Sequence, residues 1–127
     1  YSITYAEVNY AAANKLKVAN VINPAGNAVE PNSVNTSAFL SQAAMDSNGI
    51  MSFDYATKEA GAYPLGIVSY MLADTSYPDK TKGAAVKALA TYLLSPTCAK
   101  DKGGNLGFSV IDGEFLKKAQ SQIAKIG

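Results

Sequence analysis

The chain has 127 residues, a formal net charge of +1 and 48% apolar residues. This length suits one modest domain or a piece of a larger one, and the apolar content is enough for a core. The small net charge argues against a strong general attraction to nucleic acid or to an anionic membrane. All 11 basic residues are Lys, so the chain has no arginine to bind phosphate or carboxylate groups in a bidentate way. It also has no His, and therefore lacks the commonest general base and the commonest zinc ligand.

The single cysteine, Cys98, cannot form a disulfide within the chain. It follows a predicted helix, and we expect a half-buried thiol there; the alternative is a partner on chain outside this sequence. No apolar run reaches the roughly 18 residues of a membrane span, and no signal peptide is visible. Because the sequence begins with Tyr1 and not Met, we expect a processed, cleaved or excised piece.

The first elements in chain order are a helix and a hairpin. An Ala-rich segment predicts a helix over 5–14, and residues 18–22 are strand-like. Asn23-Pro24-Ala25-Gly26-Asn27 is typical of a turn, after which Ala28-Val29 is expected to pair back.

A second helix is expected after the N-cap candidates at 33–35. It would carry Phe39, Leu40 and Ala44, and Asn48-Gly49 would end it. We expect residues 50–60 to form a loop with a helical turn.

The strongest strand prediction is Tyr63–Ala73. Pro64 suits the first residue of a strand, because proline cannot donate to a ladder. The residues that follow are apolar at both odd and even positions, which is typical of a strand buried on both faces. Such a strand needs neighbours on both edges and helices above and below.

The C-terminal part is predicted to be mostly helical. After a polar loop, the apolar stripe of Val86, Leu89, Ala90 and Leu93 predicts a helix over about 81–94, limited by Pro96. A turn-rich loop is expected at Lys100–Asn105 and an extended segment at 106–110. A final helix opens near Asp112 and carries an apolar face, formed by Phe115, Ala119, Ile123 and Ile126.

Strands that alternate with helices predict an α/β fold with a short mixed sheet covered by helices. Only two to four short strands are expected from this sequence. A sheet this small would expose much of its edge, so we expect residues outside the chain to complete it.

Three groups of segments carry a resemblance. The first is Ser2-Ile3-Thr4-Tyr5-Ala6-Glu7-Val8-Asn9-Tyr10-Ala11, followed by Asn23-Pro24-Ala25-Gly26. The second is Ala62-Tyr63-Pro64-Leu65 with Ser69-Tyr70-Met71-Leu72. The third is Leu106-Gly107-Phe108-Ser109-Val110-Ile111 with Phe115-Leu116 and residues 119–126. In this order they resemble the phosphate-binding protein of the phosphate-specific ABC importer. The chain departs from that pattern where Thr4 and Ala6 replace Gly and Val, and where Ser109 and Asp112 stand in place of prolines.

The resemblance implies a type II periplasmic-binding-protein fold, in which two lobes hold a ligand between them. It implies that residues 1–127 are a single segment, the C-terminal part of such a protein. Residues 1–25 would be the end of the second lobe and the crossing between lobes, and residues 26–127 would belong mainly to the first lobe. The family's phosphate ligands would then precede Tyr1, and no residue of this chain inherits a ligand role.

The function implied is capture of inorganic phosphate for uptake through an ABC permease in the membrane, with this segment acting as scaffold. The location implied is extracytoplasmic, periplasmic or at the cell surface, with a lipid anchor on the missing N-terminus. The partners would be phosphate, the permease and the N-terminal part of the same protein, with no nucleic acid and no cofactor. The alternative is a cell-surface or adhesion module that reuses the fold without binding phosphate.

Several residue groups invite a chemical interpretation, and each has a simpler structural one. Lys100–Asn105 could form an anion-binding nest around Gly103-Gly104, but a solvated turn is the simpler interpretation. Asp112 and Glu114 could be paired carboxylates, but helix capping and the helix dipole explain them better. Asp46 and Asp54 lack the spacing of metal ligands, and no nucleophile motif accompanies the serines, so we expect no enzyme and no metal site.

The tyrosines offer a last candidate, a stacking surface for bases. They are scattered over several predicted elements, and no basic groove accompanies them. We therefore expect tyrosine rings that are half-buried at the edge of the core, with their hydroxyls in contact with solvent. The residues are Tyr5, Tyr10, Tyr55, Tyr63, Tyr70, Tyr77 and Tyr92.

Overall fold

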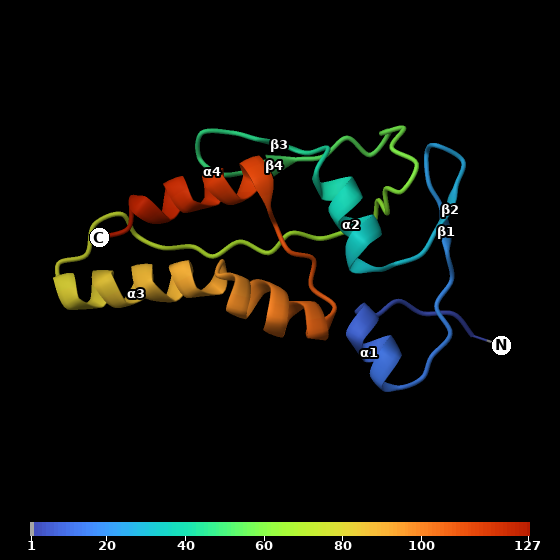
Figure 1. The fold of residues 1–127 in the computed structure, drawn as a ribbon, viewed down its shortest axis with the longest axis horizontal. Coiled ribbons are helices and arrows are strands. Elements are labelled where there is room, and N and C mark those ends of the chain that lie inside the picture. The colour runs from blue at the N-terminus through green and yellow to red at the C-terminus, as the bar shows by residue number, and fades with distance from the viewer. Residues whose placement is uncertain (1) are drawn as a thin grey trace.

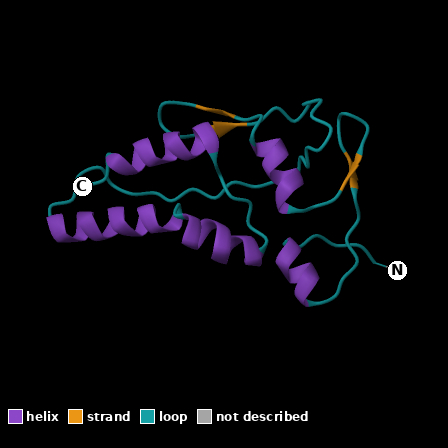
Figure 2. Ribbon diagram, viewed as in Figure 1, coloured by secondary structure: helices purple, strands orange, loops and turns teal. Residues whose placement is uncertain are grey.

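The structure is a computed structural model that describes residues 2–127. In this part of the chain, four α-helices, a π-helix and a 3₁₀ turn are joined by long irregular segments and two very short hairpins (Figures 1 and 2). In chain order the elements are α1 (Val8–Ala13), β1 (Val21–Ile22), β2 (Ala28–Val29), α2 (Ser33–Leu40), β3 (Ala44–Met45), β4 (Met51–Ser52), α3 (Lys80–Leu93), η1 (Pro96–Gly103), η2 (Gly104–Leu106) and α4 (Gly113–Ala124). The predicted mixture of helix and strand is confirmed.

The first hairpin is where the sequence predicts it. β1 pairs antiparallel with β2, in the register Val21 with Val29 and Ile22 with Ala28. The turn between them uses Gly26 at φ +84°, a left-handed conformation that glycine adopts without strain. The strand is shorter than the predicted 18–22.

The second hairpin replaces the predicted end of a helix. α2 begins after Asn32, whose side chain accepts from the Asn35 amide, but it ends at Leu40, so that Ala44 lies in a strand. β3 and β4 pair antiparallel across a turn in which the Asp46 carboxylate accepts from the amides of Asn48 and Ile50, at 2.8 and 2.9 Å. An aspartate that captures amides two and four residues ahead favours a turn over a continued helix.

The prediction of one mixed sheet is wrong for residues 2–127. The two hairpins are separate two-stranded antiparallel pairs. The predicted strand Tyr63–Ala73 joins neither of them and crosses the molecule as the long light-green stretch between α2 and the start of α3 (Figure 1). It is not buried on both faces either, because Ile67 is 90% exposed and Leu72 is 93% exposed. The physical reason is that no strand among the described residues lies beside it as a hydrogen-bonding partner.

The C-terminal helices confirm two predictions and correct a third. α3 fills the predicted range, and its N-cap Asp79 accepts from the amides of Thr81 and Lys82. α4 is present as well, although Ile126 lies beyond its end. The predicted loop at Lys100–Asn105 is wrong, because Pro96 at the first position of η1 permits a new helix to start where α3 has stopped.

The buried core lies under α2. Phe39, Leu40 and Ala62 form its centre, with Phe53 and Val68 packed against them. Phe39 stacks on Phe53 with ring centroids 5.6 Å apart, and the Tyr55 ring lies 5.5 Å from Phe39. Aromatic pairs at these distances add to the stabilisation that comes from burial alone.

One buried amide ties the first hairpin to this core. The Asn23 side chain is 3% exposed. The two N–H groups of its Nδ2 donate to three carbonyl oxygens, those of Glu59, Ala60 and Ala62 at 3.3, 3.0 and 3.1 Å, so that one N–H is shared between two of them. Its Oδ1 accepts from the amides of Ala25 and Asn27. A single side chain therefore shapes the turn and holds residues 59–62 against it.

Replacing Asn23 by Ala should lower the free energy of unfolding of the chain by about 2–3 kcal/mol, because buried carbonyls and amides lose their partner. Urea unfolding followed by circular dichroism measures this. Asn27→Ala is the matched control, since the Asn27 side chain is exposed, and it should change stability by less than about 0.5 kcal/mol. Equal effects of the two substitutions would contradict the role of the Asn23 amide.

Candidate functional site

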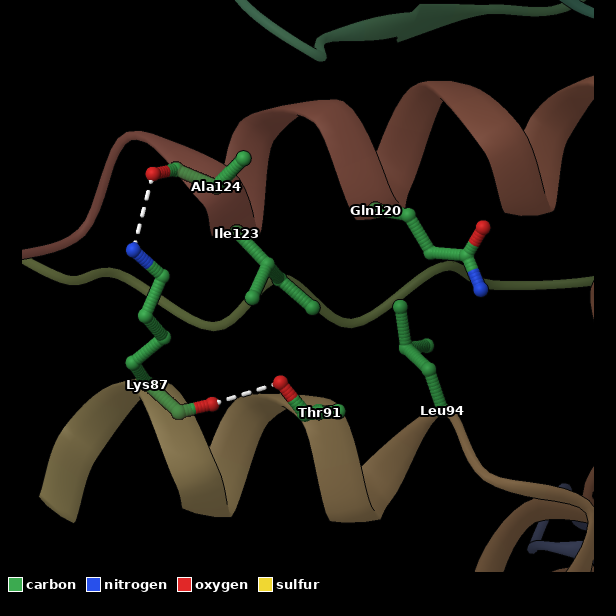
Figure 3. Close-up of a pocket in the computed structure, with 6 residues that line it drawn as sticks. All are labelled: Lys87, Thr91, Leu94, Gln120, Ile123 and Ala124. Atoms are coloured by element: carbon green, nitrogen blue, oxygen red, sulfur yellow. Dashed lines mark hydrogen bonds between the residues drawn. The ribbon is translucent and has the colours of Figure 1, made fainter. Parts of the chain in front are cut away.

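A small cavity of about 240 Å³ lies between α3 and α4. The two helices run side by side, and the lining residues project into the space between them (Figure 3). They are Lys87, Thr91 and Leu94 from α3, and Gln120, Ile123 and Ala124 from α4. The lining thus combines apolar side chains with one cation, one hydroxyl and one amide.

The ammonium group of Lys87, the cation of this cavity, is already hydrogen-bonded within the protein. Lys87 Nζ donates to the carbonyl oxygens of Ala124 and Ile126, at 2.9 and 2.8 Å (Figure 3 draws the first). These carbonyls belong to the last turn of α4 and the residues after it, where a helix presents unpaired acceptors and a partial negative charge. The hydroxyl of Thr91 donates to the Lys87 carbonyl, 2.8 Å away. Thr91 therefore bonds within α3, and Lys87 holds the end of α4 on α3.

Lys100–Asn105 does not form an anion-binding nest. Gly103 and Gly104 both have right-handed helical conformations, with φ of −63° and −56°. A nest needs successive amides in alternating right- and left-handed conformations. The amide of Gly104 donates to Lys100 O, and Gly103 O accepts from Phe108. The anion hypothesis for this segment is wrong.

The carboxylates have structural roles or face solvent. Asp112 occupies the N-cap position of α4, but its side chain makes no capping hydrogen bond there, so the predicted cap is wrong. Glu114 lies in the first turn of α4 and forms a solvent-exposed ion pair with Lys117 at 2.6 Å. Asp54 accepts from the Ala56 amide, a turn role like that of Asp46. Within residues 2–127, no group of His, Cys, Asp and Glu side chains could hold a metal ion.

The tyrosines do not form one stacking surface. Tyr63 and Tyr77 are half-buried as predicted, whereas Tyr5, Tyr10, Tyr55, Tyr70 and Tyr92 are exposed. Two hydroxyls accept backbone hydrogen bonds: Tyr70 from the Met51 amide at 2.9 Å, and Tyr77 from the Asp74 amide at 3.1 Å. Cys98 is a free and partly buried thiol, as predicted.

The two polar side chains that organise the fold, Asn23 and Lys87, carry almost no signal in the sequence. The pattern around Asn23 indicates only a turn, and Lys87 is not one of the residues that define the predicted apolar stripe. Lys87 does stand beside Val86 in the apolar stripe of α3, which is a weak signal for a lysine that is not free in solvent. Its partners lie 37 and 39 residues away, and no local pattern indicates them.

Lys87→Met should lower the free energy of unfolding by about 1–2 kcal/mol, because the end of α4 loses a charged donor. Thermal or urea unfolding measures the loss. Lys82→Met is the matched control: Lys82 is an exposed lysine of the same helix, and the change expected there is within about 0.5 kcal/mol. A Lys87→Met protein as stable as the control would show that the contact contributes nothing.

The described side chains do not by themselves indicate a function, but the sequence has relatives of known name. Within residues 2–127, no helix is long and apolar enough to cross a membrane. No model of a protein family matches the sequence, and no solved structure matches it. Phosphate-binding protein PstS 3 of Mycobacterium tuberculosis is 32% identical over 132 residues, and the same values hold for PstS3 of Mycobacterium bovis. PstS 2 of Mycobacterium tuberculosis is 30% identical over 101 residues.

These matches cover most of this chain but only a small part of each relative. The PstS 3 match covers 98% of this chain but only 35% of the relative. The PstS 2 match covers 75% of this chain and 27% of the relative. The chain therefore spans about a third of the length of the curated relatives it matches. The resemblance predicted from the motifs is confirmed. Nearly the whole of this chain is similar to a segment of the PstS phosphate-binding proteins, and that segment makes up about one third of their length.

Proposed function

We propose that this chain is the C-terminal portion of an extracytoplasmic solute-binding protein that captures inorganic phosphate for uptake through an ABC-type permease. The observation that carries the proposal is the match of nearly the whole chain to proteins named for phosphate binding, at 32% identity. The order of the three motif groups supports the C-terminal placement. In this proposal residues 1–25 end the second lobe and cross between lobes, and residues 26–127 belong mainly to the first lobe.

The segment acts as scaffold, and the principal phosphate ligands lie in the part of the protein outside it. Three features support this assignment. The chain has no Arg, the residue best suited to bidentate contact with phosphate. The only lysine of the α3–α4 cavity is held by two carbonyl oxygens. The amides around Gly103-Gly104 lie in helical turns and do not converge on a ligand.

The segment is not an enzyme in this proposal. It has no His, and its single Cys is a partly buried thiol. Its carboxylates cap turns or lie on the surface, and none of them is placed beside a nucleophile as acid–base catalysis requires. The partners are phosphate, the permease and the rest of the same protein.

Calorimetric titration with inorganic phosphate tests the proposal on two proteins: the complete parent protein and the 127-residue chain alone. The complete protein should bind phosphate, and the chain alone should bind it with a dissociation constant weaker than about 1 mM. Circular dichroism of the chain before titration confirms that it is folded.

The two proteins test separate parts of the proposal. No heat from the complete protein would contradict phosphate capture and favour the adhesion alternative. Micromolar binding by the chain alone would contradict the placement of the ligands outside it.

A further inference from the structure

The turn between β3 and β4 holds the one Asn-Gly pair of the sequence, Asn48-Gly49. Asn48 is exposed, and among residues 2–127 its side-chain amide has no hydrogen-bonding partner. The turn borders an open groove, so water reaches the pair. An asparagine before glycine is chemically labile, because no Cβ shields the next backbone nitrogen from the carboxamide carbon.

The turn itself requires this glycine. Gly49 has φ of +86°, a left-handed conformation that glycine adopts without strain. A Cβ at Gly49 would also lie 3.3 Å from Cγ of Gln122, a residue of α4. The geometry that selects glycine therefore also leaves Asn48 open to attack by the backbone.

The pair is restrained by few contacts. The Gly49 amide donates to the Asp46 carbonyl oxygen at 3.2 Å, and it must leave that hydrogen bond before it can react. Both strands of the hairpin are two residues long, so the turn opens at a low cost in free energy. The turn lies beside α4 (Figure 1), from which Gln122 Nε2 donates to the Ser47 carbonyl oxygen at 2.9 Å. This contact opposes the opening of the turn.

We propose that Asn48-Gly49 is a site of spontaneous deamidation in the folded protein, at a rate that Gln122 of α4 restrains. The proposal goes beyond the proposed function and does not depend on it. The Gly49 backbone nitrogen attacks Asn48 Cγ and loses its proton, the Cγ–Nδ2 bond breaks, and ammonia leaves with that proton. Water, the co-reactant, then opens the cyclic succinimide. Attack of water at Cγ gives aspartate, and attack at the backbone carbonyl carbon of residue 48 gives isoaspartate, with no electron transfer in either case.

Both products change the turn. Each adds a carboxylate close to Asp46, and like charges repel. Asp46 Oδ1 accepts from the amides of Asn48 and Ile50, at 2.8 and 2.9 Å. Isoaspartate inserts a methylene group into the main chain between these two amides, so they lose the spacing that Asp46 bridges. Deamidation therefore loosens the β3–β4 hairpin.

The test incubates the complete protein at several pH values and follows each asparagine by peptide mapping with tandem mass spectrometry. Deamidation appears as a gain of about 1 Da at residue 48. Asn27 is the matched comparison within the same molecule, since it is exposed in the other hairpin turn but precedes Ala28. Conversion at Asn48 should be at least about tenfold faster than at Asn27. Its rate should rise with pH, because the attacking nitrogen must lose its proton.

Two glutamine variants test the restraint by α4. Gln122→Ala should speed conversion about threefold, because loss of one hydrogen bond makes the turn easier to open. Gln120→Ala is the control and should leave the rate unchanged, since Gln120 is an exposed glutamine of the same helix. Circular dichroism checks that both variants are folded.

Two results would overturn the proposal. Conversion at Asn48 that is no faster than at Asn27 would remove the site. Equal rates in the two glutamine variants would remove the restraint by Gln122. Neither result depends on whether the complete protein binds phosphate, so a failure here is distinct from a failure of the proposed function.

Discussion

The fold depends on the buried amide of Asn23. Its two N–H groups contact three carbonyl oxygens and fix residues 59–62, and its oxygen accepts from two amides and shapes the turn between β1 and β2. Within residues 2–127 the strands form two short hairpins, and no longer ladder of backbone hydrogen bonds holds these segments together. A side chain that satisfies buried backbone groups from two distant segments is therefore the main polar constraint on the core.

The position of the irregular segment 64–73 follows from that constraint. Ala62 is completely buried at the centre of the core, and the chain leaves it directly toward Gly66 and Val68 on the surface of α2. The inner face of the segment is thus held by the chain itself. The outer side of the segment stays exposed. The same arrangement explains how one segment can be well placed and yet highly exposed.

Local signals in the sequence predicted the first hairpin, α3 and α4 because each depends on contacts between near neighbours: a glycine turn for the hairpin and an apolar stripe for each helix. The end of α2, the helix at Pro96–Gly103 and the roles of Asn23 and Lys87 depend on competition between local hydrogen bonds or on distant partners. The strand prediction at Tyr63–Ala73 rested on apolar composition alone, and among residues 2–127 no strand lies beside this segment to pair with it. The candidate anion loop failed because its glycines adopt helical conformations, which a Gly-Gly pair alone does not reveal.

The central claim is that this chain is a scaffold segment of a longer phosphate-binding protein. Hydrogen exchange of the backbone amides of residues 66–73, in the chain alone and in the complete protein, tests it most directly. The account predicts little protection in the chain alone and slowing on the order of a thousandfold or more in the complete protein, as for amides that the rest of a protein covers. Equal and weak protection in both proteins would contradict the claim.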